Sequence, residues 1–168
     1  MGVISNGTTL LDAGSLDSGV ATGAMTLIKT LTASSSSTLS FVHGASSVVF
    51  DGTYKEYIFK YIDIHPSADN VNFLFNLSAD AGSNYNVTKT TTFWEAYNRE
   101  DGGDNYLAFA DGRDLHQSTN FQQLNGAGVQ DENDGSISGT LTVFDPANTT
   151  FVKHFYSVSE SNAHNAHY

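Results

Sequence analysis

The sequence predicts an all-β protein: an antiparallel, jelly-roll-like β-sandwich with an extended N-terminal arm. Three observations support this prediction. Short runs rich in β-branched and aromatic residues alternate with Gly-, Ser-, Asn- and Asp-rich turns along most of the chain. Several of these runs alternate apolar and polar residues with a period of two, as half-buried strands do. No run has an apolar stripe with a period of 3.6 residues, and a short helix would fit only within 104–124.

The first 23 residues differ in texture from the rest of the chain. They are rich in Gly, Ser, Thr and Asp, with turn signals at Asn6-Gly7 and Ser18-Gly19. We therefore expect residues 1–23 to form an extended N-terminal arm and residues 24–168 to form one β-sandwich domain. Two interpretations of the arm stay open: a frayed terminus, or a segment that orders against a neighbouring subunit.

From residue 24 onward the chain repeats one pattern of short runs and turns. In 56–63, for example, Tyr57, Phe59 and Tyr61 fall on one face of an expected strand. The expected strands are 25–32, 38–43, 47–50, 56–63, 72–78, 87–98, 106–110, 119–124, 136–144 and 150–158. Short strands at this spacing are typical of a sandwich or jelly roll, and no fixed-period repeat divides the chain further.

Charge excludes two classes of partner. The net charge is −11, with only seven Lys and Arg. Binding to nucleic acid depends on clustered basic side chains that displace counterions, and an anionic membrane surface makes the same demand. We therefore expect neither nucleic acid nor a membrane as a partner. The longest apolar stretches are also too short to span a bilayer.

The absence of cysteine limits the chemistry of the chain. Without cysteine there is no disulfide, no thiolate nucleophile and no Cys-ligated zinc. The first residues, Met-Gly-Val-Ile-Ser-Asn, lack the basic and long apolar regions of a secretory signal, so we expect synthesis in the cytoplasm.

The acidic residues are typical of turns rather than of a catalytic pair. Most of the 18 Asp and Glu lie in clusters with Gly and Asn, where the Asp side chain bonds nearby backbone. No Gly-x-Ser-x-Gly elbow and no phosphate-binding loop is present. We expect no enzymatic activity and no cofactor.

One acidic turn is a weak candidate for a metal site. The segment Asp131-Glu-Asn133-Asp134-Gly135 crowds oxygen ligands together, so Asp131, Asn133 and Asp134 are the candidate ligands. Its glycine comes one position too early for an EF-hand, and no closing Glu follows. We therefore favour a plain acidic turn and expect no metal. The pair His164-x-x-His167 near the C-terminus is interpreted as part of a polar tail.

Aromatic residues supply the candidate ligand-binding site. Trp94, Tyr97 and Tyr106 lie near Asn and Asp, and such rings can stack on sugars while amides bond the hydroxyls. The same residues on strands could equally line a core or a subunit interface. The sequence favours the core or interface over the glycan platform.

Four segments resemble a known family of phage proteins. They are Tyr-Lys-Glu-Tyr-Ile-Phe-Lys-Tyr-Ile-Asp-Ile-His-Pro (54–66), Asn-Tyr-Asn-Val-Thr-Lys-Thr-Thr-Thr-Phe-Trp (84–94), Gly-Ser-Ile-Ser-Gly-Thr-Leu-Thr-Val-Phe-Asp-Pro (135–146) and Thr-Thr-Phe-Val-Lys-His-Phe (149–155). Together they resemble small virion structural proteins, of tail-fibre or head-decoration type, from tailed phages of marine bacteria and cyanobacteria. The resemblance covers about residues 1–160 and carries no catalytic motif. Similar chains run on through further strands, so either C-terminal strands are missing here or a neighbour supplies the last one.

The resemblance implies a place on a virus particle. We expect a virion structural protein that assembles through protein–protein contacts as a capsid decoration, a cement, or another head- or tail-attached component. Its expected partners are other virion proteins of capsid or tail and further copies of itself, with a trimer favoured. The alternative is a tail fibre or adhesion module that binds a host surface glycan.

Overall fold

The computed structural model describes residues 3–5, 8–12, 15–16, 25–163 and 166–167, and the chain divides into two compact units after Thr30. The first unit contains β1 (Val3–Ser5), β2 (Thr8–Asp12) and β3 (Ser15–Leu16), which form a small antiparallel sheet in that order. Strands therefore occur within the segment for which the sequence predicts an extended arm. The expected turns at Asn6-Gly7 and Ser18-Gly19 lie outside the described residues.

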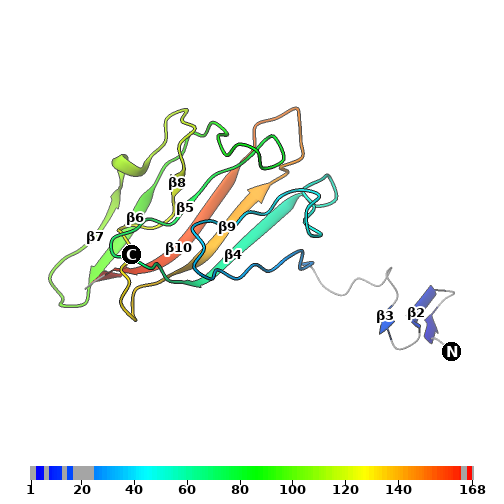
Figure 1. The fold of residues 1–168 in the computed structure, drawn as a ribbon, viewed down its shortest axis with the longest axis horizontal. Coiled ribbons are helices and arrows are strands. Elements are labelled where there is room, and N and C mark those ends of the chain that lie inside the picture. The colour runs from blue at the N-terminus through cyan, green and yellow to red at the C-terminus, as the bar shows by residue number, and fades with distance from the viewer. Residues whose placement is uncertain (1–2, 6–7, 13–14, 17–24, 164–165, 168) are drawn as a thin grey trace. The chain divides into compact units, whose positions relative to one another are not determined.

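The second unit is built almost entirely from antiparallel strands (Figure 1). Its strands are β4 (Glu56–Ile64), β5 (Leu74–Phe75), β6 (Trp94–Arg99), β7 (Asn105–Phe109), β8 (Gln122–Gln123), β9 (Ile137–Phe144), β10 (Phe155–Ala163) and β11 (Ala166–His167). Among the described residues the only helical turn is the 3-10 helix η1 (Asp111–Arg113), inside the segment where a helix would fit. The all-β prediction is confirmed.

Six of these strands form one open sheet in the order β4-β9-β10-β11-β6-β7. Strand β9, the second in this order, pairs along its length with both neighbours, and Leu141 lies opposite Phe59 on β4 and Ser157 on β10. The period-two run 136–144 therefore forms the strand that the sequence predicts. The edge strands β4 and β7 do not pair with each other, so the sheet does not close.

The core lies between one face of this sheet and the short ribbon β5–β8. Its buried residues are Tyr61, Leu124, Val129, Ile137, Leu141 and Val143. Phe73, Phe75 and Phe155 pack against this cluster. The odd-numbered residues of β9 supply the sheet's part of the core, because alternate side chains of a strand point to opposite faces. The even-numbered residues therefore point away from the ribbon.

Three expected strands are wrong, because residues 25–32, 38–43 and 47–50 belong to no strand. Backbone reversal explains part of this result. Gly44, Ser46 and Ser47 have positive φ angles, which break an extended run. The Nδ1 atom of His43 then accepts the N–H of Phe50 at 2.9 Å, so 38–50 folds back locally instead of joining a sheet. The run 25–32 has strand-like alternation but no neighbouring strand among the described residues.

Four other expected strands are shorter or shifted. The run 87–98 becomes a strand only from Trp94, while Lys89 forms an isolated bridge with Ser118. The runs 72–78 and 119–124 shorten to β5 and β8, and the last strand begins at Phe155. Turn-forming Asp145 and Asn148 cap the start of that final segment by side-chain hydrogen bonds.

Candidate functional site: an apolar sheet face

The outward face of the six-stranded sheet is formed by even-numbered residues. The register connects the strands, because His167 on β11 lies opposite Asn162 on β10 and Asn98 on β6. Residues directly opposite one another in a sheet share a face. The even-numbered residues of β6 and β10 therefore lie on the same side, away from the core.

Large apolar side chains are exposed on this face. Trp94 lies opposite Phe109, and Leu107 lies opposite Ala96. The exposed fractions of Trp94, Leu107 and Phe109 are 64%, 70% and 72%, and Val158 on β10 is 64% exposed. We call these four residues the apolar face. Exposed large apolar residues that gather on one face mark an interaction surface more often than a solvated one.

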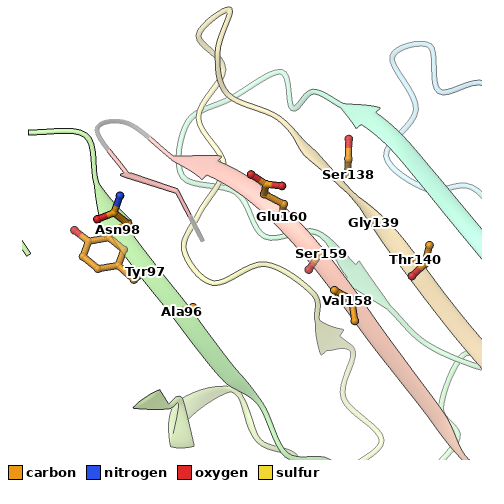
Figure 2. Close-up of a pocket in the computed structure, with 9 residues that line it drawn as sticks. All are labelled: Ala96, Tyr97, Asn98, Ser138, Gly139, Thr140, Val158, Ser159 and Glu160. Carbon is orange, nitrogen blue, oxygen red and sulfur yellow. The ribbon is translucent and has the colours of Figure 1, made fainter. Parts of the chain in front are cut away.

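A groove of about 680 Å³ runs along the same region of the sheet. Figure 2 shows its walls, with residues from β6 on one side and from β10 and β9 on the other. The lining residues are Ala96, Tyr97, Asn98, Ser138, Gly139, Thr140, Val158, Ser159 and Glu160. Small side chains and backbone dominate this set, and Glu160 is its one charged member. The groove therefore suits a polypeptide segment better than an anionic ligand.

The three aromatic residues proposed as a ligand platform do not gather on one side of the sheet. Tyr97 lies opposite Tyr106 in the β6–β7 hairpin, and their ring centroids are 4.9 Å apart. Trp94 is three positions before Tyr97 on the same strand, so it points to the other face. The structure thus brings the two tyrosines together and places Trp94 on the apolar face. The odd spacing between Trp94 and Tyr97 is the sequence signal that would have predicted this separation.

The tyrosine side of the hairpin carries a half-buried ion pair. Glu95 Oε1 accepts hydrogen bonds from the Tyr106 hydroxyl at 3.0 Å and from Arg113 Nη1 at 3.1 Å. The Glu95 side chain is only 9% exposed, and the Arg113 guanidinium also lies 5.6 Å from the centroid of the Phe93 ring. These contacts fasten η1 to the hairpin. Residues on this side of β6 therefore have a structural role.

The acidic turn makes a different cluster from the one expected. Asp131, Asp69 and Glu132 have carboxylate oxygens within 4.8 Å of one another. Asn133 and Asp134 are not part of this cluster. A hydrogen bond with Asp69 and its negative charge raise the pKa of Asp131. Sequence reasoning missed Asp69 because it lies 62 residues before Asp131 in the chain.

This carboxylate cluster has the right atoms for a hard cation but no further sign of one. All three residues are exposed, and exposed acidic groups of this kind are common without a bound ion. The backbone N–H of Asp131 donates to Asp69 Oδ1 at 3.1 Å, so the turn is already held by the protein itself. Turn formation accounts for the cluster without a ligand.

Within the described residues, every helical segment is too short to cross a membrane. No family model, curated protein or solved structure matches the chain. The apolar face and its groove are therefore the features of the molecule that point to a function.

Proposed function

We propose that the protein is a structural subunit of a phage particle that assembles through contacts with its own copies and with other virion proteins. The apolar face is the observation that carries this proposal. Each of its four large apolar side chains is at least 64% exposed, and exposure of apolar surface to water is unfavourable for a subunit on its own. Packing a neighbour over this face removes that surface from water, which drives assembly.

The layered architecture supports a role in a shell or tail. The ribbon β5–β8 covers one side of β4–β9–β10, and the proposed fold is a jelly-roll-like sandwich that assembly completes on the other side. We favour a trimer, because a closed ring uses the same surfaces in every copy and then stops growing. The role is that of a capsid decoration, a cement, or another head- or tail-attached component.

Charge supports a position away from the packaged genome. The net charge of −11 disfavours contact with DNA, because like charges repel and no basic cluster displaces counterions. The same acidity keeps free subunits soluble until a specific partner surface is available. We propose that the mature protein is found on the virion after synthesis in the host cytoplasm.

Sedimentation of the full chain tests the assembly step. We expect an oligomer whose population rises with concentration, and we expect Leu107→Ser combined with Val158→Ser to shift it to monomer. Val152→Ser is the matched control, because Val152 is also highly exposed but precedes β10 and lies outside the groove. Circular dichroism confirms that each variant remains folded. A wild-type chain that stays monomeric at all concentrations contradicts self-assembly.

Binding to purified particles tests the virion role. A decoration or cement protein is expected to bind capsids at a defined stoichiometry and to raise their melting temperature. A tail component is expected to bind tails and not capsids. Failure to bind either structure, by a chain that still folds, would overturn the proposed location.

A second function is favoured by one observation, the exposed indole of Trp94 beside the groove. Apolar rings stack on sugars, and Asn98 on the same face of β6 could bond a hydroxyl. This arrangement would suit an adhesion module that binds a host surface glycan. A glycan array probed with wild type and Trp94→Ala separates the two functions, because glycan binding lost without any change in oligomeric state would favour the adhesin.

A further inference from the structure

The large sheet has an open position between two of its strands. Strand β11 pairs with the ends of both β10 and β6, and its described part has two residues. Beyond β11, and among the described residues, 155–161 of β10 pair only with β9, and 94–97 of β6 pair only with β7. Since β11 is antiparallel to both neighbours, β10 and β6 run parallel to each other with room for one strand between them. We call this space the open strand position; Figure 2 shows β6 and β10 on its two sides.

Backbone groups from both strands point into this position. The N–H of Asn162 donates to Ser136 and the carbonyl of His154 accepts from Phe144, so even-numbered residues of β10 bond to β9. Odd-numbered residues such as Ser157 and Ser159 then present their peptide groups to the other side. Peptide groups need hydrogen-bond partners, so two facing edges of this kind form a template for an added strand.

Strand β6, on the other side of the open strand position, also presents backbone groups toward it. Hydrogen bonds from Ala110 to Phe93 and from Arg99 to Asp104 show that odd-numbered residues of β6 bond toward β7. Trp94 and Ala96 therefore turn their peptide groups toward β10. An inserted strand would gain two rows of hydrogen bonds instead of the single row offered at an ordinary sheet edge.

The same chain carries a strand-like segment that joins no sheet. Residues 25–33, Met-Thr-Leu-Ile-Lys-Thr-Leu-Thr-Ala, are rich in β-branched residues and belong to no strand. Met25 and Leu27 are 70% and 82% exposed. Leu27, Lys29 and Leu31 alternate with threonine and isoleucine, so one face of this segment is apolar with a single positive charge.

We propose that residues 29–33 of a second copy insert antiparallel into the open strand position, between β6 and β10. This inference rests on the proposed function, because it names the contact by which the copies assemble. The occupant is another copy of this chain, since each copy presents both an unfilled position and a segment able to fill it. Addition of a strand to an open sheet edge is a recurring mode of protein recognition.

The register follows from the pairing already present at the end of the position. Asn162 and Asn98 lie at the level of His167, so Glu160 lies level with Ala96, and Val158 lies level with Trp94. An antiparallel strand with Lys29 between Glu160 and Ala96 places Leu31 between Val158 and Trp94. Lys29 then lies beside the oppositely charged Glu160, and Leu31 lies beside two apolar side chains on the neighbouring strands.

Other registers lose these pairings. A shift of one residue turns Leu31 and Lys29 to the core side and leaves threonines beside Val158. A shift of two residues sets Lys29 between Val158 and Trp94, away from Glu160. In the proposed register Thr30 and Thr32 point inward on the side of Ser157 and Ser159, where small hydroxyl side chains are compatible. The chain's acidity makes Lys29 distinctive, because it is one of only seven basic residues.

Cross-linking tests this contact cleanly because the chain contains no cysteine. A Lys29→Cys chain is mixed with a Glu160→Cys chain that carries a mass tag, and the mixture is oxidised. We expect a disulfide-linked pair of one tagged and one untagged chain. A Lys29→Cys chain mixed with Val152→Cys is the matched control and should remain uncrosslinked, because Val152 lies outside the open strand position.

Charge reversal gives an independent readout in solution. Lys29→Glu and Glu160→Lys should each weaken self-association about tenfold or more, whereas the double variant should recover most of the wild-type affinity. Thr30→Pro should also abolish association, because proline lacks the N–H that an inserted strand would donate. The monomer should stay folded, because residue 30 belongs to no strand.

The outcomes separate this inference from the proposed function. If oligomers form without the mixed disulfide, and neither charge reversal weakens them, self-assembly would be supported but strand insertion would be overturned. A disulfide within single chains of the Lys29→Cys, Glu160→Cys double variant would show that each chain fills its own position and would overturn insertion between copies. A strictly monomeric wild-type chain contradicts both.

Discussion

The hydroxyl oxygen of Tyr61 on β4 lies 3.0 Å from the hydroxyl oxygen of Ser157 on β10, although β9 runs between these two strands. The phenol reaches this far because Gly139, which lies opposite Tyr61 on β9, has no side chain in the way. Tyr61 thereby links three strands on the core side of the sheet. This relationship makes β9 sensitive to the addition of a single methyl group at Gly139.

Gly139→Ala is expected to destabilise the fold. An added Cβ would lie 2.4 Å from the carbonyl oxygen of Val158 and 2.7 Å from the Tyr61 hydroxyl. Relief of such contacts by shifting backbone costs about 1–3 kcal/mol. Urea denaturation followed by circular dichroism measures the difference. Gly112→Ala is the control, since a Cβ at Gly112 meets no atom within 4 Å; equal stability of the two variants would contradict the packing argument.

Buried Asn125 should be a second sensitive position. Its side chain is 1% exposed, and Oδ1 accepts the N–H of Phe73 at 2.8 Å while Nδ2 donates to the carbonyl of Ala127. Asn125→Ala leaves both backbone groups without these partners, and we expect a loss of about 2–4 kcal/mol in the free energy of unfolding. Exposed Asn120 in the same segment supplies the matched control as Asn120→Ala. A loss below about 0.5 kcal/mol for Asn125→Ala would show that water replaces the lost bonds.

The sequence predicts some of these features well and others poorly, for physical reasons. The period-two runs around Tyr57 and Leu141 correctly predict strands, because one side of each is buried against a core. The same alternation in 25–32 predicts a strand that is absent, since local pattern cannot say whether a neighbouring strand exists. The proximity of Asp69 to Asp131 is equally invisible, because it depends on a long-range fold.

The open strand position could not be predicted from the sequence either, because it depends on the order of the strands in the sheet. Nothing in the sequence of β6 or β10 distinguishes an edge facing a partner from an edge facing an empty position. That distinction depends on the order of strands, which local propensity does not encode. The separation of Trp94 from the two tyrosines has a simpler reason, because the odd spacing of Trp94 and Tyr97 on one strand already assigns them to opposite faces.

The turn at 78–84 should give the protein an acid-sensitive element. Hydrogen bonds from the Ser78 hydroxyl and from Asn84 lower the pKa of Asp80 to about 2, below its ordinary value of 3.8. The folded state therefore binds this proton more weakly than the unfolded state. Asp80 contributes stability above pH 3.8, and this contribution is lost as pH falls toward 2.

Melting curves of wild type and Asp80→Asn across this range test the prediction. We expect wild type to melt at the higher temperature at pH 6, and the two curves to converge near pH 2. Asp104→Asn, which changes an exposed aspartate in another turn, controls for the general effect of removing one negative charge. A difference that does not change with pH would mean that the carboxylate charge contributes nothing to this turn.

Asp131 should behave in the opposite sense. Because Asp69 raises the pKa of Asp131 through a hydrogen bond and through its charge, the folded state binds the Asp131 proton more tightly than the unfolded state does. The ionised pair therefore opposes folding at neutral pH, and this penalty disappears as pH falls below the ordinary value of 3.8. Asp131→Asn is expected to raise the melting temperature at pH 7 and to have no such effect at pH 3. Asp134→Asn, in the same turn but outside the carboxylate cluster, separates repulsion within the cluster from a change in net charge. If Asp134→Asn stabilises the protein as much as Asp131→Asn does, the net charge of −11 and not the contact with Asp69 is the cause.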